Sequence, residues 1–233
     1  MTKSQIKKLL NKKVKSDCLD FLKIIPDDYV DLIIFDPQYG SGVSAGSRPA
    51  KSRNQLEQTR LKNAKKFKSM SNFFIGLNLF ELERTLKPSG YFLWWMNKHF
   101  LLFDVQFMLL KSNIGVVDLL VWENQRFGMG SRTRRASEYL LILQKQPIKI
   151  AKWKDHSIKD VWSEKSPTKK HYHKKPFELT KTLIECTTDE QDIVLDICAG
   201  SFESLEICQS VNRNFLGCDL EVEDDLQTKL KDV

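Results

Sequence analysis

The stretch VDLIIFDPQYG, residues 30–40, decides the fold class of this chain. Its nearly continuous apolar run is typical of a strand that is buried on both faces of a parallel sheet. The run stops at an acid, a proline, a glutamine and a tyrosine, which are Asp36, Pro37, Gln38 and Tyr39. In sheets of this kind, ligands bind beyond the carboxyl ends of the strands. We therefore expect these four residues to belong to a functional site.

The rest of the chain alternates between helical and strand-like patterns. Apolar residues at helical spacing predict helices over 72–86, 99–113, 175–187 and 204–212. Short apolar runs predict strands over 91–97, 116–123, 138–145, 192–196 and 213–219. This alternation predicts a single α/β domain over residues 1–233. Its core would be a Rossmann-like, doubly wound and mostly parallel sheet with helices on both faces.

The composition is that of an ordinary globular protein. Of 233 residues, 41% are hydrophobic and 29% are charged, and no apolar run approaches the roughly 20 residues that span a bilayer. The basic N-terminus lacks the apolar core of a signal peptide, so we expect a cytoplasmic protein with no membrane partner. The five cysteines form no C-x-x-C pair. We expect reduced thiols rather than disulfides, and no metal site.

Basic residues are concentrated in three segments of a chain whose net charge is +7. The segments are residues 48–68, 126–135 and 164–175. Their clustering indicates a polyanion as partner, with the three segments along one groove. The alternative is that they are solvated surface loops.

Two further strand-like segments end in acids. IVLDICAGS places Asp196 just before a small, glycine-containing loop, and FLGCD ends on Asp219. A second acid at this separation, one strand along, is the geometry that binds the hydroxyls of an adenosine ribose. Each acid taken alone could be a helix cap. Together with residues 36–39 they indicate one site at the edge of the sheet.

These segments together resemble the β class of amino-group DNA methyltransferases, which use S-adenosylmethionine (AdoMet) to methylate adenine N6 or cytosine N4. DPQY (36–39) is similar to the family's catalytic Asp-Pro-Pro-Tyr, and HKKPFELTKTLI (173–184) resembles its His-Pro-x-Gln-Lys-Pro segment. DIVLDICAGSFES (192–204) resembles its cofactor loop, and RNFLGCDLE (213–221) the strand after it. The catalytic segment precedes the cofactor loop, and this circularly permuted order marks the β class. The match covers residues 14–220.

The resemblance implies a mechanism for the tetrapeptide. Adenine N6 and cytosine N4 are poor nucleophiles that lie inside a duplex, so the target base must be flipped out. Tyr39 would stack on the base, while the Asp36 carboxylate and the Pro37 carbonyl would accept the two N–H bonds of its amino group. The nitrogen could then attack the sulfonium methyl in line, with placement supplying most of the rate.

The resemblance also implies an AdoMet site. Asp219 would hold the ribose hydroxyls, Asp17 and Cys18 would flank the adenine, and the loop after Asp196 would surround the methionine part. Lys175 would approach from the segment before a helix, or could equally be a surface lysine. The full set of expected cofactor-binding residues is Asp17, Cys18, Asp36, Lys175, Pro176, Asp196, Ala199, Gly200, Ser201 and Asp219.

DNA contacts are expected from two stretches of the chain. These are a mobile basic loop over 41–70 and a Gly/Arg-rich loop over 123–137, in which arginine would meet phosphates or guanine edges. His171 and His173 lie beside lysines, so we expect them to face solvent or DNA rather than a metal ion. The candidate DNA-contacting residues are Arg48, Lys51, Arg53, Arg132, Arg134 and Arg135.

The chain departs from the family pattern at two places. Gln38 replaces a proline, and since glutamine does not fix φ, a looser catalytic segment and a reduced rate are expected. In the cofactor loop Ile197 replaces a proline and Phe202 a glycine, and Glu203 adds an acid. Bulk and negative charge are therefore expected beside the carboxylate of AdoMet, with weaker binding or a shifted pose.

The favoured function is adenine-N6 methylation, because aspartate at the first tetrapeptide position is commoner among adenine enzymes and serine among cytosine-N4 enzymes. The alternatives are a cytosine-N4 methyltransferase and a catalytically inactive DNA-binding subunit that pairs with an active methyltransferase. RNA and protein methyltransferases with similar signatures usually have the unpermuted order. Besides DNA, the partners to consider are a second copy in a homodimer, a partner methyltransferase subunit and a cognate restriction enzyme.

Overall fold

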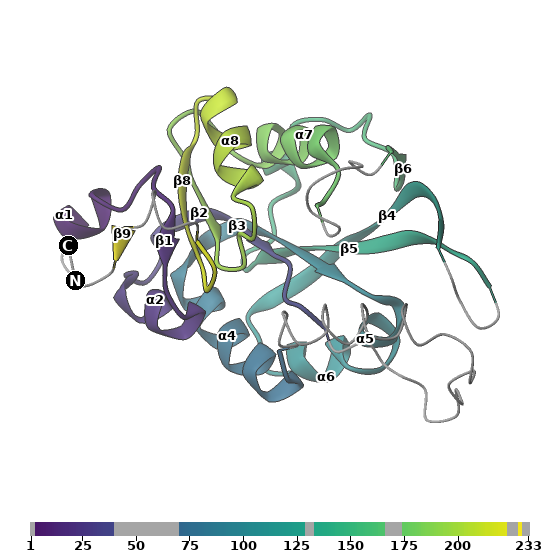
Figure 1. The fold of residues 1–233 in the computed structure, drawn as a ribbon, viewed down its shortest axis with the longest axis horizontal. Helices are drawn as coiled ribbons and strands as arrows, with labels where there is room; N and C mark the ends of the chain where they lie inside the picture. The colour runs from purple at the N-terminus through teal and green to yellow at the C-terminus, as the bar shows by residue number, and fades with distance from the viewer. Residues whose placement is uncertain (1–2, 40–69, 129–132, 166–173, 223–227, 230–233) are drawn as a thin grey trace, which may run out of the picture.

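The fold is built on one nine-stranded sheet with helices on both faces (Figure 1). The computed structural model describes residues 3–39, 70–128, 133–165, 174–222 and 228–229. Across the sheet the strands run in the order β6 (Val161–Ser163), β4 (Ile114–Gly128), β5 (Arg135–Lys145), β3 (Leu86–Met96), β2 (Val30–Phe35), β7 (Ile193–Asp196), β8 (Asn214–Asp219), β1 (Val14–Lys15) and β9 (Thr228–Lys229).

The sheet is mostly parallel. Strand β2 lies at its centre and pairs in parallel with β3 on one side and β7 on the other. Only β5 runs against its neighbours, pairing antiparallel with both β3 and β4. The expected doubly wound, Rossmann-like fold is therefore confirmed.

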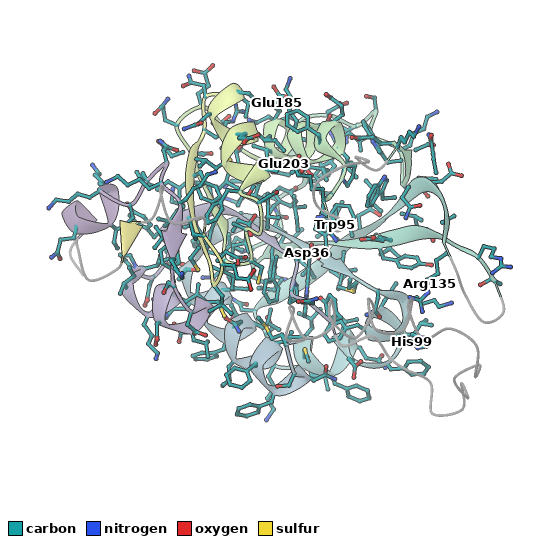
Figure 2. All side chains as sticks on the ribbon, in the orientation of Figure 1. Asp36, Trp95, His99, Arg135, Glu185 and Glu203 are labelled. Atoms are coloured by element: carbon teal, nitrogen blue, oxygen red, sulfur yellow. The ribbon has the colours of Figure 1, made fainter. Side chains whose placement is uncertain are left out.

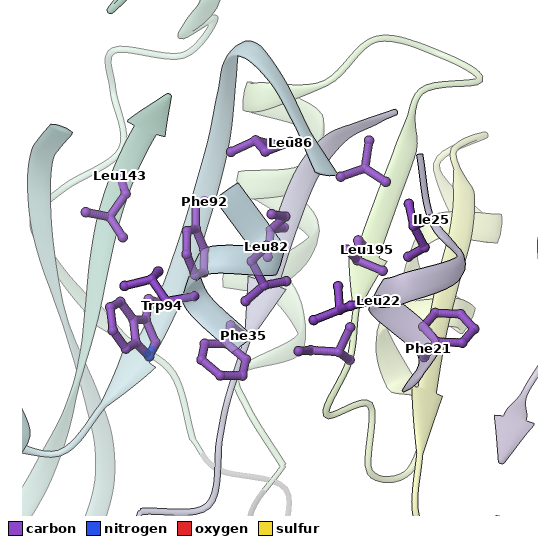
Figure 3. Packing of buried hydrophobic residues seen from close by; sticks show 14 of the residues in the cluster. Phe21, Leu22, Ile25, Phe35, Leu82, Leu86, Phe92, Trp94, Leu143 and Leu195 are labelled. Atoms are coloured by element: carbon purple, nitrogen blue, oxygen red, sulfur yellow. The ribbon is translucent and has the colours of Figure 1, made fainter. Parts of the chain in front are cut away.

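Side chains alternate across the sheet and so create two cores. On β2, Ile33 and Phe35 point into the first core, while Leu32 and Ile34 point into the second. The first core contains the stacked aromatic rings around Trp94 (Figure 3). It is covered by α2 (Cys18–Ile24), α4 (Asn72–Thr85), α5 (Lys98–Phe103) and α6 (Val105–Leu109). The second core is covered by α7 (Phe177–Thr187) and α8 (Glu203–Ser210). The short elements α1 (Lys3–Lys7) and η1 (Ile150–Lys152) complete the described structure.

Three boundaries differ from those predicted. The single helix expected over 99–113 is two short helices, α5 and α6, separated at Asp104. Helix α4 ends at Thr85, and the KPSG segment after it is part of β3 rather than a turn between helix and strand. The pairing of β3 with β2 shifts in register within this segment. The Gly/Arg-rich segment 123–137, predicted as a loop, is a β-hairpin at both ends, because Glu123 pairs with Ser137 and Gly128 with Arg135.

The predicted basic loop over 41–70 lies outside the described residues, except for Met70. Its backbone N–H donates to the Gln38 carbonyl oxygen at 2.8 Å. His171 and His173 also lie outside the described residues. Within the described ranges, no helix is long and apolar enough to cross a membrane.

Candidate active site

The register of the sheet brings the catalytic segment and the cofactor loop together. Ile34 of β2 pairs with Asp196 at the end of β7, so the residues after both strands leave the same edge of the sheet. Asp196 in turn pairs with Gly217 of β8, and a Cβ on Gly217 would lie 2.2 Å from the Asp196 carbonyl oxygen. Glycine is therefore required for this close approach, which brings Asp219 to the same edge.

The N-terminal segment reaches this edge through β1. Lys15 pairs with Asp219, and the Ser16 N–H donates to the Asp219 carbonyl oxygen at 3.1 Å. The exposed Asp17 then begins α2, with its carboxylate accepting from the N–H of Leu19 at 2.9 Å. Asp17 and Cys18 are thus adjacent to the cofactor loop.

Tyr39 is held in a fixed position beside the strand ends. Its hydroxyl donates to the carbonyl oxygen of Trp95 at 2.8 Å, and its ring centroid lies 4.6 Å from that of Phe100 on α5. Burial, with a smaller contribution from Asp36, raises the pKa of Tyr39 well above its usual value. The hydroxyl is therefore a neutral donor, and the ring is a rigid aromatic surface.

Asp36 is joined to a partly buried lysine and a second acid. The Nζ of Lys175 lies 2.9 Å from Oδ2 of Asp36 and 3.0 Å from Oε2 of Glu138. The same ammonium lies 5.3 Å from the ring centroid of Trp95, near Asp36 in Figure 2. Burial lowers the pKa of Lys175, but the two carboxylates outweigh it, so the net shift of this pKa is upward. Lys175 is therefore a cation bound to the Asp36 carboxylate, rather than a surface lysine.

Glu138 and Trp95 were not identified as site residues from the sequence. Glu138 lies directly before the part of β5 that pairs antiparallel with β3, in which Trp95 pairs with Leu140. Glu138 and Trp95 both lie near Lys175 because β5 is the neighbour of β3 in the sheet. No local sequence pattern encodes this strand order.

Asp196 shapes the cofactor loop from within. It is only 6% exposed, its Oδ1 accepts from the Cys198 N–H at 3.1 Å, and its Oδ2 accepts from the Ser204 hydroxyl at 2.6 Å. Burial raises the pKa of Asp196 to about 7, and the neighbouring Asp36 and Asp219 add to the shift. Both carboxylate oxygens thus bind residues of the chain itself.

Asp219 and the loop glycine lie at the surface of this edge. The Gly200 N–H donates to Oδ2 of Asp219 at 2.8 Å, and the Ala199 N–H donates to the Cys218 carbonyl oxygen at 3.2 Å. Gly200 has a φ of +53°, and nothing lies within 4 Å of where its Cβ would be. Open space beside a left-handed glycine is what a ligand needs to approach the backbone closely. Ser201 follows, half-buried.

Three of the five free cysteines gather beneath the loop. Cys18, Cys198 and Cys218 interact with one another, and burial is the main cause that raises the pKa of each thiol. These side chains are therefore neutral, and they line the inner side of the site without adding charge.

Phe202 and Glu203 do not crowd the outer surface of the cofactor loop. The expectation that Phe202 adds bulk beside the ligand is wrong, because its ring is 2% exposed and lies edge-on to Phe215 in the second core. The added charge of Glu203 is balanced by Lys174, whose Nζ lies 2.9 Å from Oε1. Phe202 has a φ of +59°, a conformation in which glycine carries no steric cost.

The described candidates for DNA contact lie on the β4–β5 hairpin. Arg134 and Arg135 are both exposed, and Figure 2 places Arg135 far along the hairpin from Asp36. Arg48, Lys51, Arg53 and Arg132 lie outside the described residues. A groove of about 270 Å³ beside Tyr91, Gln144 and Trp153 lies toward the other end of β3 and contains none of the expected site residues.

The fold and the two strand-end motifs define a Rossmann-like methyltransferase with permuted motif order, and comparison with known proteins supports this class. A DNA methylase family model for N6 and N4 enzymes matches residues 30–224. The Type II methyltransferase M.HhaII of Haemophilus parahaemolyticus is 41% identical over 218 residues, 93% of each chain. M2.MboI of Moraxella bovis, also a Type II methyltransferase, is 23% identical over 90% of this chain and 82% of its own length.

Solved structures agree in fold. The cytosine-N4-specific PvuII DNA methyltransferase has a TM-score of 0.66 at 15% identity, over 90% of this chain and 81% of its own. The complex of M1.HpyAVI with SAM has a TM-score of 0.64 at 19% identity, over 90% and 93% of the two chains. The chain belongs to the N6/N4 DNA methylase family, which confirms the resemblance to AdoMet-dependent amino-group DNA methyltransferases.

Proposed function

We propose that this chain is a Type II DNA methyltransferase that transfers the methyl group of AdoMet to N6 of a flipped-out adenine, in the cytoplasm of a bacterium. The observation that carries the proposal is the meeting of Asp36 and Tyr39 with the loop after Asp196 at one edge of the sheet. The choice of adenine rests on aspartate at the first tetrapeptide position. The bacterial Type II relatives support the class of enzyme.

Lys175 would favour the ionised form of the Asp36 carboxylate and hold that carboxylate in one orientation. A cation 2.9 Å from Oδ2 favours the ionised form of Asp36, and only an ionised carboxylate is purely an acceptor for the N–H bonds of the target base. The Pro37 carbonyl would accept the second N–H bond. With both bonds accepted, the lone pair of N6 is directed toward the methyl donor. Asp36 would accept the proton that N6 gives up when it is methylated, or pass it to solvent.

Tyr39 positions the base. Its hydroxyl donates to the Trp95 carbonyl oxygen, and its ring lies against Phe100. Because the side chain is already ordered, little conformational entropy would be lost when a base stacks on it. Base–aromatic stacking of this kind is worth about 1–3 kcal/mol.

The residues at the loop fit AdoMet, which when bound supplies an activated methyl group on a sulfonium. Gly200 leaves open space beside the backbone, and Asp219 lies one strand along, where ribose hydroxyls would bind. The methionine part would lie along Ala199, Gly200 and Ser201, and the adenine beside Asp17 and Cys18. Asp196 and Pro176 act indirectly: Asp196 shapes the loop, and Pro176 is buried at the start of α7.

The experiment is methyl transfer from tritiated AdoMet to unmethylated plasmid DNA, followed by digestion to nucleosides. N6-methyl-2′-deoxyadenosine is the expected product, and Asp36→Ala should abolish its formation. N4-methyl-2′-deoxycytidine would overturn the choice of base but leave the enzyme class intact. DNA binding without AdoMet binding or product would instead identify an inactive DNA-binding subunit.

A further inference from the structure

Glu138 points to the same face of the sheet as two tryptophans of the second core. On β5 its side chain alternates in step with Leu140 and Ile142, which are buried in that core. Across the ladder it pairs with Trp122 of β4, and Trp95 of β3 lies diagonally from it, opposite Leu140. The two indole rings meet edge-on, with their centroids 6.0 Å apart. Glu138 is therefore a carboxylate beside an aromatic surface.

Lys175 reaches this face from the segment before α7, the helix that covers the second core. Its Nζ lies 3.0 Å from Oε2 of Glu138, 2.9 Å from Oδ2 of Asp36 and 5.3 Å from the ring centroid of Trp95. The exposed fractions of the three charged side chains are 42% for Glu138, 30% for Asp36 and 18% for Lys175. The ammonium is thus the least exposed of the three charges, and it is contacted from three directions.

A lysine with a single carboxylate partner would not hold that carboxylate firmly. Its ammonium is a compact charge on a flexible four-carbon stem and has three rotatable N–H donors. Such a group can move between the two oxygens of one carboxylate with little change in energy. Contacts to Glu138 and Trp95 remove this freedom, so that the ammonium of Lys175 stays in one place. Oδ2 of Asp36 therefore has a partner in a fixed position.

Glu138 also limits the effect of the ammonium on the charge of Asp36. Both carboxylate oxygens lie within 3.0 Å of the same nitrogen atom, so they are separated by at most about 6 Å, twice the longer distance. At this separation each negative charge makes ionisation of the other carboxyl less favourable. A carboxylate that is too strongly stabilised as an anion is a weak proton acceptor. One cation shared between two acids keeps Asp36 ionised without removing its ability to accept a proton.

Three other titratable side chains interact with Asp36 from neighbouring parts of the site. They are Tyr39 of the catalytic segment, Asp196 at the end of β7 and Cys198 of the cofactor loop. Burial raises the pKa of each, for Asp196 to about 7, so all three are largely uncharged in acid solution. Within this described cluster, the charges that act on Asp36 at low pH are therefore those of Lys175 and Glu138.

We propose that Glu138 is a positioning residue for methyl transfer, which holds the Lys175 ammonium against Asp36 and limits the stabilisation that Asp36 receives from it. The inference rests on the proposed function, in which the Asp36 carboxylate accepts an N–H bond of the target base. Glu138 acts through Lys175 and needs no contact of its own with the base or with AdoMet.

The test is a double-mutant cycle in the full chain, measured as single-turnover methylation of DNA at saturating AdoMet. Glu138→Gln keeps the size of the side chain and removes its charge. It should lower the rate roughly tenfold, because a slightly misplaced carboxylate is a poorer acceptor. In the Lys175→Met background the same substitution should change the rate less than about twofold, because the group through which Glu138 acts is already missing. Glu185→Gln is the control, since Glu185 is exposed on α7 and lies far from Asp36 in Figure 2; it should leave the rate unchanged.

The pH–rate profile separates this role from a purely structural one. In Glu138→Gln the acid limb should move to lower pH by roughly half a pH unit or more, because a negative charge near Asp36 is removed while the cation remains. This direction is opposite to that expected for Lys175→Met. Glu138→Asp, which retains the charge on a shorter side chain, should keep the acid limb near its wild-type position and lose less of the rate.

Urea unfolding would establish that each variant is folded. An equal loss of rate in both backgrounds, or an acid limb that stays in place in Glu138→Gln, would overturn the inference and leave the methyltransferase assignment intact. A Glu138→Gln protein as fast as the wild type would do the same. A wild type that transfers no methyl group to DNA would instead overturn the proposed function, and this inference with it.

Discussion

Gln38 and Phe202 both replace residues that are common in the family, but their surroundings differ: Gln38 is exposed and Phe202 is buried. Gln38 is exposed within the catalytic segment, and its backbone carbonyl oxygen accepts the Met70 N–H. Phe202 is buried in the second core against Phe215. The first departure thus lies where the target base would bind, and the second lies where the sheet is packed.

Residues at this one edge of the sheet therefore fall into two groups, those expected to take part in the reaction and those that pack the core. In the catalytic segment, Lys175 and the Trp95 carbonyl hold the polar atoms of Asp36 and Tyr39 in place. In the cofactor loop, Asp196 and Phe202 are held by burial. Substitutions in the first group should change the rate, and substitutions in the second should change stability.

The largest effect is expected for Asp36→Ala. Without the carboxylate, one N–H bond of the target base loses its acceptor, and the rate of methyl transfer should fall at least about 10³-fold. Stability should change little, because Asp36 is 30% exposed. Single-turnover methylation and urea unfolding measure the two quantities. An active Asp36→Ala enzyme would show that the Asp36 carboxylate is not needed for methyl transfer.

Phe202→Gly should cost stability instead. Loss of the buried ring costs about 3–5 kcal/mol, and relief of the left-handed backbone at φ +59° returns about 1 kcal/mol, so a net loss of about 3 kcal/mol is expected. Phe202→Leu, which retains part of the apolar volume, should lose less. Calorimetric titration should give AdoMet affinities within a few-fold of the wild type. Affinity raised more than tenfold would show that Phe202 disturbs the ligand site after all.

Lys175→Met should lower the methylation rate about hundredfold, because it removes the cation that holds Asp36 ionised. The acid limb of the pH–rate profile should move to higher pH, whereas Lys175→Arg should keep it near the wild-type position. Lys87→Met, which breaks the pair with Asp31 at the far end of β2, is the control and should leave the profile unchanged. A Lys175→Met profile identical to that of the wild type would mean that the lysine is only structural.

Asp196 should make the protein less stable as the pH rises. Its pKa is about 7 in the folded state, above the ordinary value of 3.8, so the folded state binds the extra proton between these values. Stability is therefore fully present below the ordinary pKa and is lost as the pH rises toward 7. Between pH 5 and pH 8 the loss should be about 2 kcal/mol. In Asp196→Asn this part of the slope should disappear from urea unfolding curves; an unchanged slope would assign it to other groups.

Gln38→Pro should have the smallest effect. Proline restricts the unfolded chain and the free catalytic segment by about 0.4–1 kcal/mol, so the rate should stay within about fivefold of the wild type, or rise. Steady-state kinetics with a saturating concentration of AdoMet would measure it. A loss of more than about tenfold would instead give the glutamine side chain a direct role at the base.

The strands and helices that position the site could be predicted because their patterns are local. The apolar run of β2 and the helical spacing of α4, α7 and α8 can each be recognised within a few turns or residues. The break between α5 and α6 could not, since apolar residues continue on both sides of Asp104 and the break coincides with its contact to Asn72. The outer part of the β4–β5 hairpin was missed because it has no apolar alternation, and its described residues are held by backbone pairing of Glu123 with Ser137 and of Gly128 with Arg135.

The candidate site divides in the same way. Strand ends, and hence Asp36, Asp196 and Asp219, follow from the sequence once a parallel sheet is expected. The partner of Lys175 does not, because it depends on β5 lying beside β3. The burial of Phe202 also depends on tertiary packing, since sequence alone places it in a loop.

Helix α5 has a consequence for how firmly the ring of Tyr39 is held. Within six residues it places Phe100 against Tyr39 and turns Leu102 and Phe103 outward. Anything that steadies the outer side of so short a helix also steadies the aromatic ring on which the base would stack. Substitutions that fray α5 from its outer side should therefore lower the rate of methylation, while the sheet itself stays intact.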